Sequence, residues 1–325
     1  MPEILVSVLL FVVGLVCLIK GGDWFVDGVS ALAKHFHLPE LLIGATVVSI
    51  GTTLPEVMVS TMSAISGHGE IAYGNAIGSV ICNTALIAAL TVAIRPGKVN
   101  RATLRIPVLF FFGAAVLFAA VAYATGYFSR PVGFALLAIF VVYMIVTVIQ
   151  MKKHPDEVEV EEEEPAKQRT LLLEIVLLVI GAALIAVGAR LLVDNGTKIA
   201  TALGVPESVI ALTFVALGTS LPELVTAITS LAKGHSALSL GNVIGANLFN
   251  IVLVCGASVS LNPFAVPQES VIAGRNASLV MDFPVMFAVM LLLTVPALLR
   301  GKLGRWQGIL LLLIYAGFCA VQFSL

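Results

Sequence analysis

The chain has 325 residues, of which 59% are hydrophobic and 11% charged, and its mean hydropathy is +1.06. A soluble domain of this size could not keep so much apolar surface out of water, so the composition predicts an all-α polytopic membrane protein. The net charge of −1 gives no indication of a nucleic-acid partner. The cysteines lie inside apolar runs, and we expect them to be reduced, without disulfides or metal: Cys17, Cys82, Cys255 and Cys319.

Ten apolar runs are long enough to cross a hydrocarbon core of roughly 30 Å. In chain order, they cover residues 3–20, 40–66, 72–94, 105–125, 130–150, 170–192, 206–232, 238–261, 279–299 and 305–323. No basic residue precedes the first run, so we expect a first spanning helix that is retained rather than a cleaved signal peptide.

A strongly polar linker, residues 151–169, separates the fifth run from the sixth, and most of its acidic residues fall between Asp156 and Glu164. It divides the chain into a first five-helix half, residues 1–150, and a second, residues 170–325. The simplest interpretation is a solvated tether. A regulatory Ca²⁺ sensor is the sharper alternative, but the stretch is short and has no EF-hand spacing.

Lys and Arg are distributed unequally between alternate loops, with fourteen in one set and four in the other. The positive-inside rule then places both termini on the non-cytoplasmic side and the linker 151–169 in the cytoplasm. Because five spans are an odd number, the second half must enter the bilayer from the opposite side to the first. The sequence therefore predicts two inverted-topology five-helix repeats, the plan of many secondary transporters.

An internal repeat supports this plan. Residues 39–83 align without a gap with residues 206–250 at a constant offset of 167, and 18 of the 45 aligned pairs are identical. Each copy carries one glutamate in an apolar run, Glu56 and Glu223. A charged side chain near the bilayer centre costs about 3 kcal/mol or more. A structural carboxylate is the alternative, but two repeat-related copies favour an ion pathway.

The glutamates end the motifs GTTLPE, from residue 51, and GTSLPE, from residue 218. Pro55 and Pro222 each remove a backbone N–H, so carbonyls one turn earlier need another partner, which in transporters is often a cation. A simple kink is the alternative for both prolines. Hydroxyl-bearing residues three and four positions before each glutamate can share its helix face: Thr52, Thr53, Thr219 and Ser220.

A second repeated motif, GNxIG followed by asparagine five residues later, places Asn83 and Asn250 at matching positions. Ser79 lies four residues before Asn83 and shares its face. For Asn75 and Asn242 we favour helix–helix contacts over ion binding. Carboxylates, amides, hydroxyls and carbonyls are the ligands that Ca²⁺ and Na⁺ prefer, whereas zinc and copper prefer nitrogen and sulfur.

At these residues the chain resembles the Ca²⁺/cation antiporter superfamily, and in particular the bacterial inner-membrane members of the sodium/calcium exchanger family. The two motifs look like the paired α-repeats of that family. The resemblance implies that Glu56 and Glu223 are the central shared carboxylates. It also implies further ion ligands, with backbone carbonyls at the last two positions: Thr52, Thr53, Ser79, Asn83, Thr219, Ser220, Asn250, Ser49 and Ala216.

Two positions depart from the family pattern. Many exchangers carry an aspartate at one of the two positions that Asn83 and Asn250 occupy here, so this site holds one carboxylate fewer. Ala246 stands where a serine is common, so the hydroxyl of Ser79 has no counterpart in the second half.

We expect a secondary-active antiporter that exchanges Na⁺ for Ca²⁺ in a lipid bilayer, with the transported ions and no cofactor. A Ca²⁺/H⁺ antiporter is the nearest alternative, because glutamates also carry protons. A cation channel ranks lower, because inverted repeats suit alternating access better. The chain has no HExxH and no GxSxG motif, so we do not expect an enzyme. The oligomeric state stays open.

Overall fold

The computed structural model describes residues 2–36, 38–153, 170–202, 218–268 and 271–322. Among these residues, nine helices are long and apolar enough to cross a membrane, so the chain is a multi-pass helical membrane protein as predicted. The expected span 206–232 is described only in its second part, as the shorter apolar helix α11 (Leu221–Ala232). Residues 206–217 lie outside the described residues.

The helices follow the expected runs closely. The first half contains α1 (Pro2–His35), α2 (Glu40–Ile43), η1 (Gly44–Val48), α3 (Ser49–Ile65), α4 (Gly69–Cys82), η2 (Asn83–Ala88), α5 (Ala89–Ile94), α6 (Arg101–Thr125) and α7 (Arg130–Lys153). The second half contains α8 (Leu171–Ala202), α11, α12 (Ser236–Phe249), η4 (Asn250–Cys255), α13 (Gly256–Leu261), η5 (Ser278–Asp282), α14 (Phe283–Arg300) and α15 (Arg305–Gln322). The η segments are π-helical turns within longer helices.

The first and sixth helices are longer than predicted. The apolar run that was expected to end at residue 20 continues as helix to His35, and α8 continues to Ala202 rather than ending at residue 192. In α1, the polar positions do not end the helix because they have partners: the ammonium of Lys233 lies 2.7 Å from a carboxylate oxygen of Asp27. The same ammonium donates to the backbone carbonyl of Asp23 at 3.0 Å.

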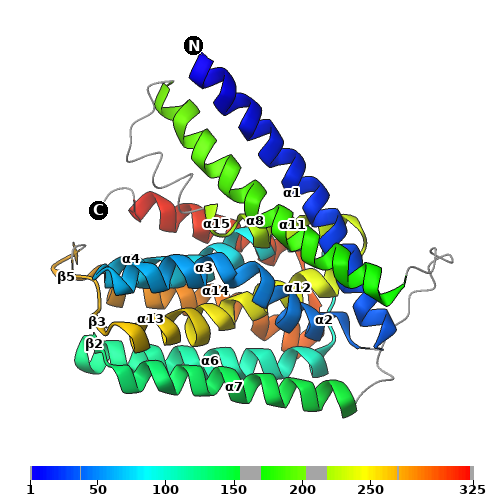
Figure 1. The fold of residues 1–325 in the computed structure, drawn as a ribbon. Helices are drawn as coiled ribbons and strands as arrows, with labels where there is room; N and C mark the ends of the chain where they lie inside the picture. The colour runs from blue at the N-terminus through cyan, green and yellow to red at the C-terminus, as the bar shows by residue number, and fades with distance from the viewer. Residues whose placement is uncertain (1, 37, 154–169, 203–217, 269–270, 323–325) are drawn as a thin grey trace.

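Helices α1 and α8 form an antiparallel pair that projects from the main helical layers (Figure 1). Their axes approach closely because glycines meet at the crossing. A Cβ added to Gly21 would lie 2.9 Å from the carbonyl oxygen of Gly181, and one added to Gly188 would lie 2.8 Å from that of Gly14. Gly14 corresponds to Gly181, and Gly21 to Gly188, at the offset of 167. Helices α1 and α8, which occupy equivalent positions in the two halves of the sequence, thus run in opposite directions.

Another close crossing joins the halves nearer the centre, where α12 packs against α2, η1 and the start of α3. A Cβ on Gly241 would lie 2.2 Å from the carbonyl oxygen of Leu41. A Cβ on Gly245 would lie 2.6 Å from the Cα of Ala45. The glycines of the GNxIG motif in the second half therefore bring that helix into backbone contact with the first repeat.

Short two-stranded sheets connect the halves at the helix ends. Strand β1 (Gly97–Lys98) pairs with β6 (Lys302–Leu303), and β2 (Tyr127–Phe128) pairs with β3 (Phe264–Ala265), each antiparallel. A third sheet pairs β4 (Val271–Ile272) with β5 (Arg275–Asn276). The β1–β6 pairing brings together two of the loops that the charge distribution assigned to the basic, cytoplasmic side.

The largest apolar core lies between α4, α6, α13 and α14 and contains a cluster of aromatic rings. The rings of Phe118 and Phe128 stack with centroids 4.1 Å apart, and Tyr73 and Phe283 pack around them. This core holds the helices that carry the repeated motifs in a fixed arrangement.

Candidate ion-binding site

The two repeat-related glutamates come together in the interior. Glu56 in α3 and Glu223 in the first turn of α11 are both 0% exposed. The two carboxyl groups lie within electrostatic range of each other. Two acidic groups from opposite halves, buried together inside a membrane protein, are costly unless something positive balances them.

Both carboxylates lack hydrogen-bond partners within the described part of the chain: neither oxygen of Glu56 nor of Glu223 is bonded there. Four other buried side chains of the predicted ligand set also have polar atoms without a hydrogen-bond partner in the described structure: Thr53, Asn83, Ser220 and Asn250. Leaving one buried polar group unsatisfied costs about 1–3 kcal/mol, and more for a charged one. Unpartnered buried oxygens of this kind are available to a cation before it is bound.

Hydroxyl groups of the first repeat lie beside the carboxylate of the second. Thr52 and Thr53 are both buried, and their hydroxyls lie near the Glu223 carboxylate. No hydrogen bond of normal geometry joins them to it. Thr52 and Thr53, on the helix that carries Glu56, thus lie beside the glutamate of the other half.

Asn83 and Asn250 occupy equivalent places in the two halves. Each is 0% exposed, and each is the first residue of a π-helical turn, η2 and η4. π-Helical turns inside longer helices are frequently found at functional sites. Ser79, one turn before Asn83 in α4, is also buried. The second-half counterpart of Ser79 is Ala246, so the two sides of the site differ in chemistry as the sequence indicated.

The two proline motifs, which the sequence predicts to be alike, have different backbones. Helix α3 passes through Pro55 without interruption. In the second half, Thr219 and Ser220 form a turn, and α11 begins at Leu221 with Pro222 in its first turn. Proline is well accommodated there because the first N–H groups of a helix have no intrahelical partner. The helix break is therefore present in the second motif and absent from the first.

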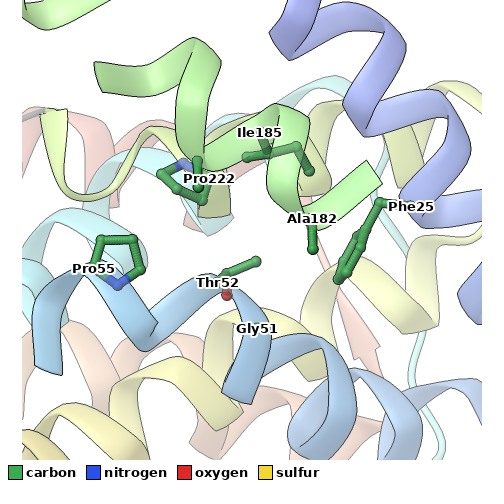
Figure 2. A pocket seen from close by; sticks show the side chains of 8 residues that line it. Phe25, Gly51, Thr52, Pro55, Ala182, Ile185 and Pro222 are labelled. Atoms are coloured by element: carbon green, nitrogen blue, oxygen red, sulfur yellow. The ribbon is translucent and has the colours of Figure 1, made fainter. Parts of the chain in front are cut away.

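A small cavity separates the proline motifs from the α1–α8 pair. Figure 2 shows the side chains of Pro55, Thr52 and Pro222 lining the cavity. Phe25 of α1 and Ile185 of α8 close the other wall. The α1–α8 pair thus covers the place where the two motifs meet.

The remaining predicted ligands lie close to these groups or fall outside the described residues. Thr219 is half-buried and donates to Asn75. The Ser49 side chain is fully buried, and its hydroxyl lies within hydrogen-bonding distance of two carbonyl oxygens, that of Gly44 at 2.7 Å and that of Asn242 at 2.9 Å. Ala216 lies outside the described residues.

Three residues near the site were not predicted as part of it. Asn75 and Asn242 were interpreted as helix–helix contacts, and they do join helices, but their partners include the threonines of the GT[ST]LPE motifs. Cys82, expected to be a core thiol, is buried close to Ser220 and Glu223. The repeat alignment marked the asparagines, whereas no pattern in the sequence indicated the position of the cysteine.

The arrangement supplies two formal negative charges and a set of neutral oxygens from amides and hydroxyls. One Ca²⁺ would balance both carboxylates, and Na⁺ ions could occupy the same carboxylates with the neutral oxygens completing their coordination. Both ions would compete for one set of ligands. No cluster of three or more His, Cys, Asp or Glu side chains occurs among the described residues, so the donor set does not suit zinc or copper.

Comparison with known proteins gives a consistent result. A family model described as sodium/calcium exchanger protein matches residues 6–149 and 173–324. The sodium/calcium exchanger MaX1 of Methanosarcina acetivorans is 31% identical, covering 98% of this chain and 99% of MaX1. The inner membrane protein YrbG of Escherichia coli is 34% identical over 88% of this chain and 89% of YrbG.

Among solved structures, one of the sodium-calcium exchanger NCX_Mj superposes with a TM-score of 0.82 at 34% identity, covering 98% of this chain and 99% of that chain. The sequence match extends over both halves, and the structural match extends over nearly the whole fold. The chain therefore belongs to the sodium/calcium exchanger protein family, and it is a membrane transport protein rather than an enzyme.

Proposed function

We propose that this protein exchanges Na⁺ for Ca²⁺ by alternating access at a site built on Glu56 and Glu223. Neutral ligands complete the site: Thr52, Thr53, Ser79, Asn83, Thr219, Ser220 and Asn250, with the backbone near Ser49 and Ala216. The observation that carries the proposal is the pair of fully buried carboxylates from opposite halves, all four of whose oxygens lack a partner in the described structure.

Charge balance provides a coupling rule. When the site is empty, two carboxylates are uncompensated in a low-dielectric interior, and moving the surrounding helices past them is costly. Bound Ca²⁺ or Na⁺ neutralises them, so the loaded carrier can change conformation while the empty one resists. Each ion can then cross only in exchange for another, which is antiport.

The charge distribution of the loops supplies the orientation in this proposal. Both termini lie on the non-cytoplasmic side and the linker 151–169 in the cytoplasm. The β1–β6 sheet then sits at the cytoplasmic end and the β2–β3 sheet at the other. In a cell with an inward Na⁺ gradient, net Ca²⁺ movement is outward.

The test is ⁴⁵Ca²⁺ uptake into proteoliposomes loaded with Na⁺, with the pH clamped on both sides and the membrane potential set by a K⁺ ionophore. We expect saturable uptake that depends on the outward Na⁺ gradient and disappears when choline replaces the internal Na⁺. Glu56→Gln and Glu223→Gln should each abolish it. Glu70→Gln is the matched control, because Glu70 lies at the N-terminal end of α4 beside His68.

The same assay separates the alternatives. Uptake that follows an imposed pH gradient and ignores Na⁺ would indicate Ca²⁺/H⁺ exchange. Flux that needs no counter-ion and does not saturate would indicate a channel. Full Na⁺-dependent exchange in either glutamate variant would refute the assigned site while leaving the family unchanged.

A further inference from the structure

The threonines of the two GT[ST]LPE motifs are each bonded to an asparagine on the opposite half. The Thr52 hydroxyl donates to Oδ1 of Asn242 at 3.2 Å, and the Thr219 hydroxyl donates to Oδ1 of Asn75 at 3.2 Å. The four residues form two repeat-related pairs at the offset of 167. The same link therefore occurs twice, once from each side of the site.

The direction of the Asn242 link is fixed by its other bonds. The Thr226 hydroxyl donates to the carbonyl of Pro222 at 2.9 Å, and a carbonyl can only accept. Thr226 must then accept from the Nδ2 group of Asn242, at 2.9 Å. With Nδ2 held on that side, Oδ1 faces Thr52, and because an amide oxygen only accepts, the Thr52 hydroxyl must be the donor.

The Asn75 link is fixed in the same way. Its Nδ2 group donates to the Ser60 hydroxyl at 2.8 Å and to the backbone carbonyl of Glu56 at 3.3 Å. The carbonyl is an obligate acceptor, so Oδ1 must face Thr219 and accept its proton. Asn242 is 1% exposed, and solvent therefore offers it no alternative partner.

This direction has a consequence for the carboxylates. A threonine hydroxyl has one proton and two lone pairs. The Thr52 hydroxyl lies near the Glu223 carboxylate, and hydrogen bonds to charged acceptors are the stronger ones, so this carboxylate competes with Asn242 for the Thr52 proton. Held on Asn242, the proton is unavailable, and the lone pairs of the hydroxyl remain directed away from the amide. The carboxylate correspondingly has no hydrogen bond within the described structure.

We infer that Asn242 is a positioning residue that holds the Thr52 proton away from Glu223, so that a hydroxyl lone pair and a bare carboxylate are presented to Na⁺. The inference rests on the proposed function, since it concerns the affinity of that ion site. Without the asparagine, the freed hydroxyl satisfies the carboxylate, and Na⁺ must break that bond in order to bind.

A double-mutant cycle on the purified full-length chain tests this, with equilibrium ²²Na⁺ binding as the readout. We expect Asn242→Ala to raise the half-saturating Na⁺ concentration about tenfold, the scale of one hydrogen bond to a charged group. In a Thr52→Val background, which has no hydroxyl proton to release, Asn242→Ala should cause no further change. Asn262→Ala is the matched control, because Asn262 bonds the Ala64 carbonyl at a helix end, and it should leave Na⁺ binding unchanged.

The outcomes distinguish a failure of the proposed function from a failure of the inference about Asn242. If the wild-type chain shows neither saturable ²²Na⁺ binding nor Na⁺-driven Ca²⁺ flux, the proposed function fails. If the wild type binds Na⁺ but Asn242→Ala has the same effect with and without the Thr52 hydroxyl, the asparagine acts by packing and the inference is wrong. Should Asn242→Ala not fold, the cycle of Asn242→Leu with Thr52→Val makes the same test, because leucine keeps the size of the side chain and accepts no proton.

Discussion

Replacing Glu223 by glutamine should stabilise the ion-free protein while weakening its response to Ca²⁺. The wild-type site holds two carboxylates, each 0% exposed and unbonded within the described chain. A charge in the membrane interior costs about 2.5–3.5 kcal/mol on insertion scales. Removing one of two neighbouring charges should therefore recover about 1–3 kcal/mol of stability in the empty state, since the remaining carboxylate also loses its repulsive neighbour.

The effect on Ca²⁺ has the opposite sign. With Glu223 neutral, Ca²⁺ faces one formal negative charge instead of two, and one positive charge stays uncompensated. At about 3 kcal/mol for such a charge, and 1.4 kcal/mol for each tenfold change, Ca²⁺ should bind about 100-fold more weakly. The same substitution thus separates the stability of the empty protein from its affinity for the ion.

The assay is thermal unfolding of the full-length protein in detergent, in choline chloride at alkaline pH, with a titration of Ca²⁺. We expect Glu223→Gln to melt at a higher temperature than the wild type without Ca²⁺ and to show little further shift when Ca²⁺ is added. Glu70→Gln should behave like the wild type in both conditions. A lower melting temperature in choline together with an unchanged Ca²⁺ shift would show that Glu223 is a structural carboxylate, and the charge-balance reasoning would be wrong.

Two further predictions concern the fold. Gly241→Ala should lower the melting temperature, because the added Cβ would lie 2.2 Å from a backbone carbonyl oxygen of α2, a clash worth about 1–3 kcal/mol. Gly113→Ala is the control and should leave the melting temperature unchanged, because a Cβ at Gly113 has no neighbour within 4 Å. Equal effects of the two substitutions would contradict the close crossing. In a cysteine-free background, Lys98→Cys in β1 should react with an impermeant maleimide only from the cytoplasmic side, and Ala265→Cys in β3 only from the opposite side. Labelling of both from one side would refute the proposed topology.

Most of the helical layout could be predicted because apolar length is a local property. The predicted end of the first helix at residue 20 was wrong, and this error shows where prediction from local apolar length fails. Asp23 and Asp27 indicate an exit from the bilayer when the sequence is read alone, and the helix continues because Lys233, far along the chain, neutralises both. The prediction of a charged position inside a helix depends on a partner that the local sequence does not contain.

The ion-binding site could likewise be predicted only in part. A repeat with a fixed offset was enough to select Glu56 and Glu223, which lie within electrostatic range of each other, and the threonines that contact the opposite half. The repeat did not predict the direction of the hydrogen bonds that the asparagines make. Asn75 and Asn242 were correctly interpreted as helix contacts, but their effect on Thr52 and Thr219 follows from which end of each amide faces which hydroxyl, and that depends on Ser60 and Thr226 in the folded chain.

The difference between the two proline motifs is informative because their sequences are so similar. Helix α3 is continuous through Pro55, whereas a turn precedes α11 and places Pro222 in a helical first turn. Two halves with nearly the same motif thus hold different backbones in one structure, so the motif is compatible with both. In the proposed inverted repeat, exchanging those two backbones between the halves would give the arrangement related by the pseudo-two-fold axis, open toward the other side of the membrane. The asymmetry that a symmetric sequence would not predict is therefore the feature that the proposed exchange mechanism needs.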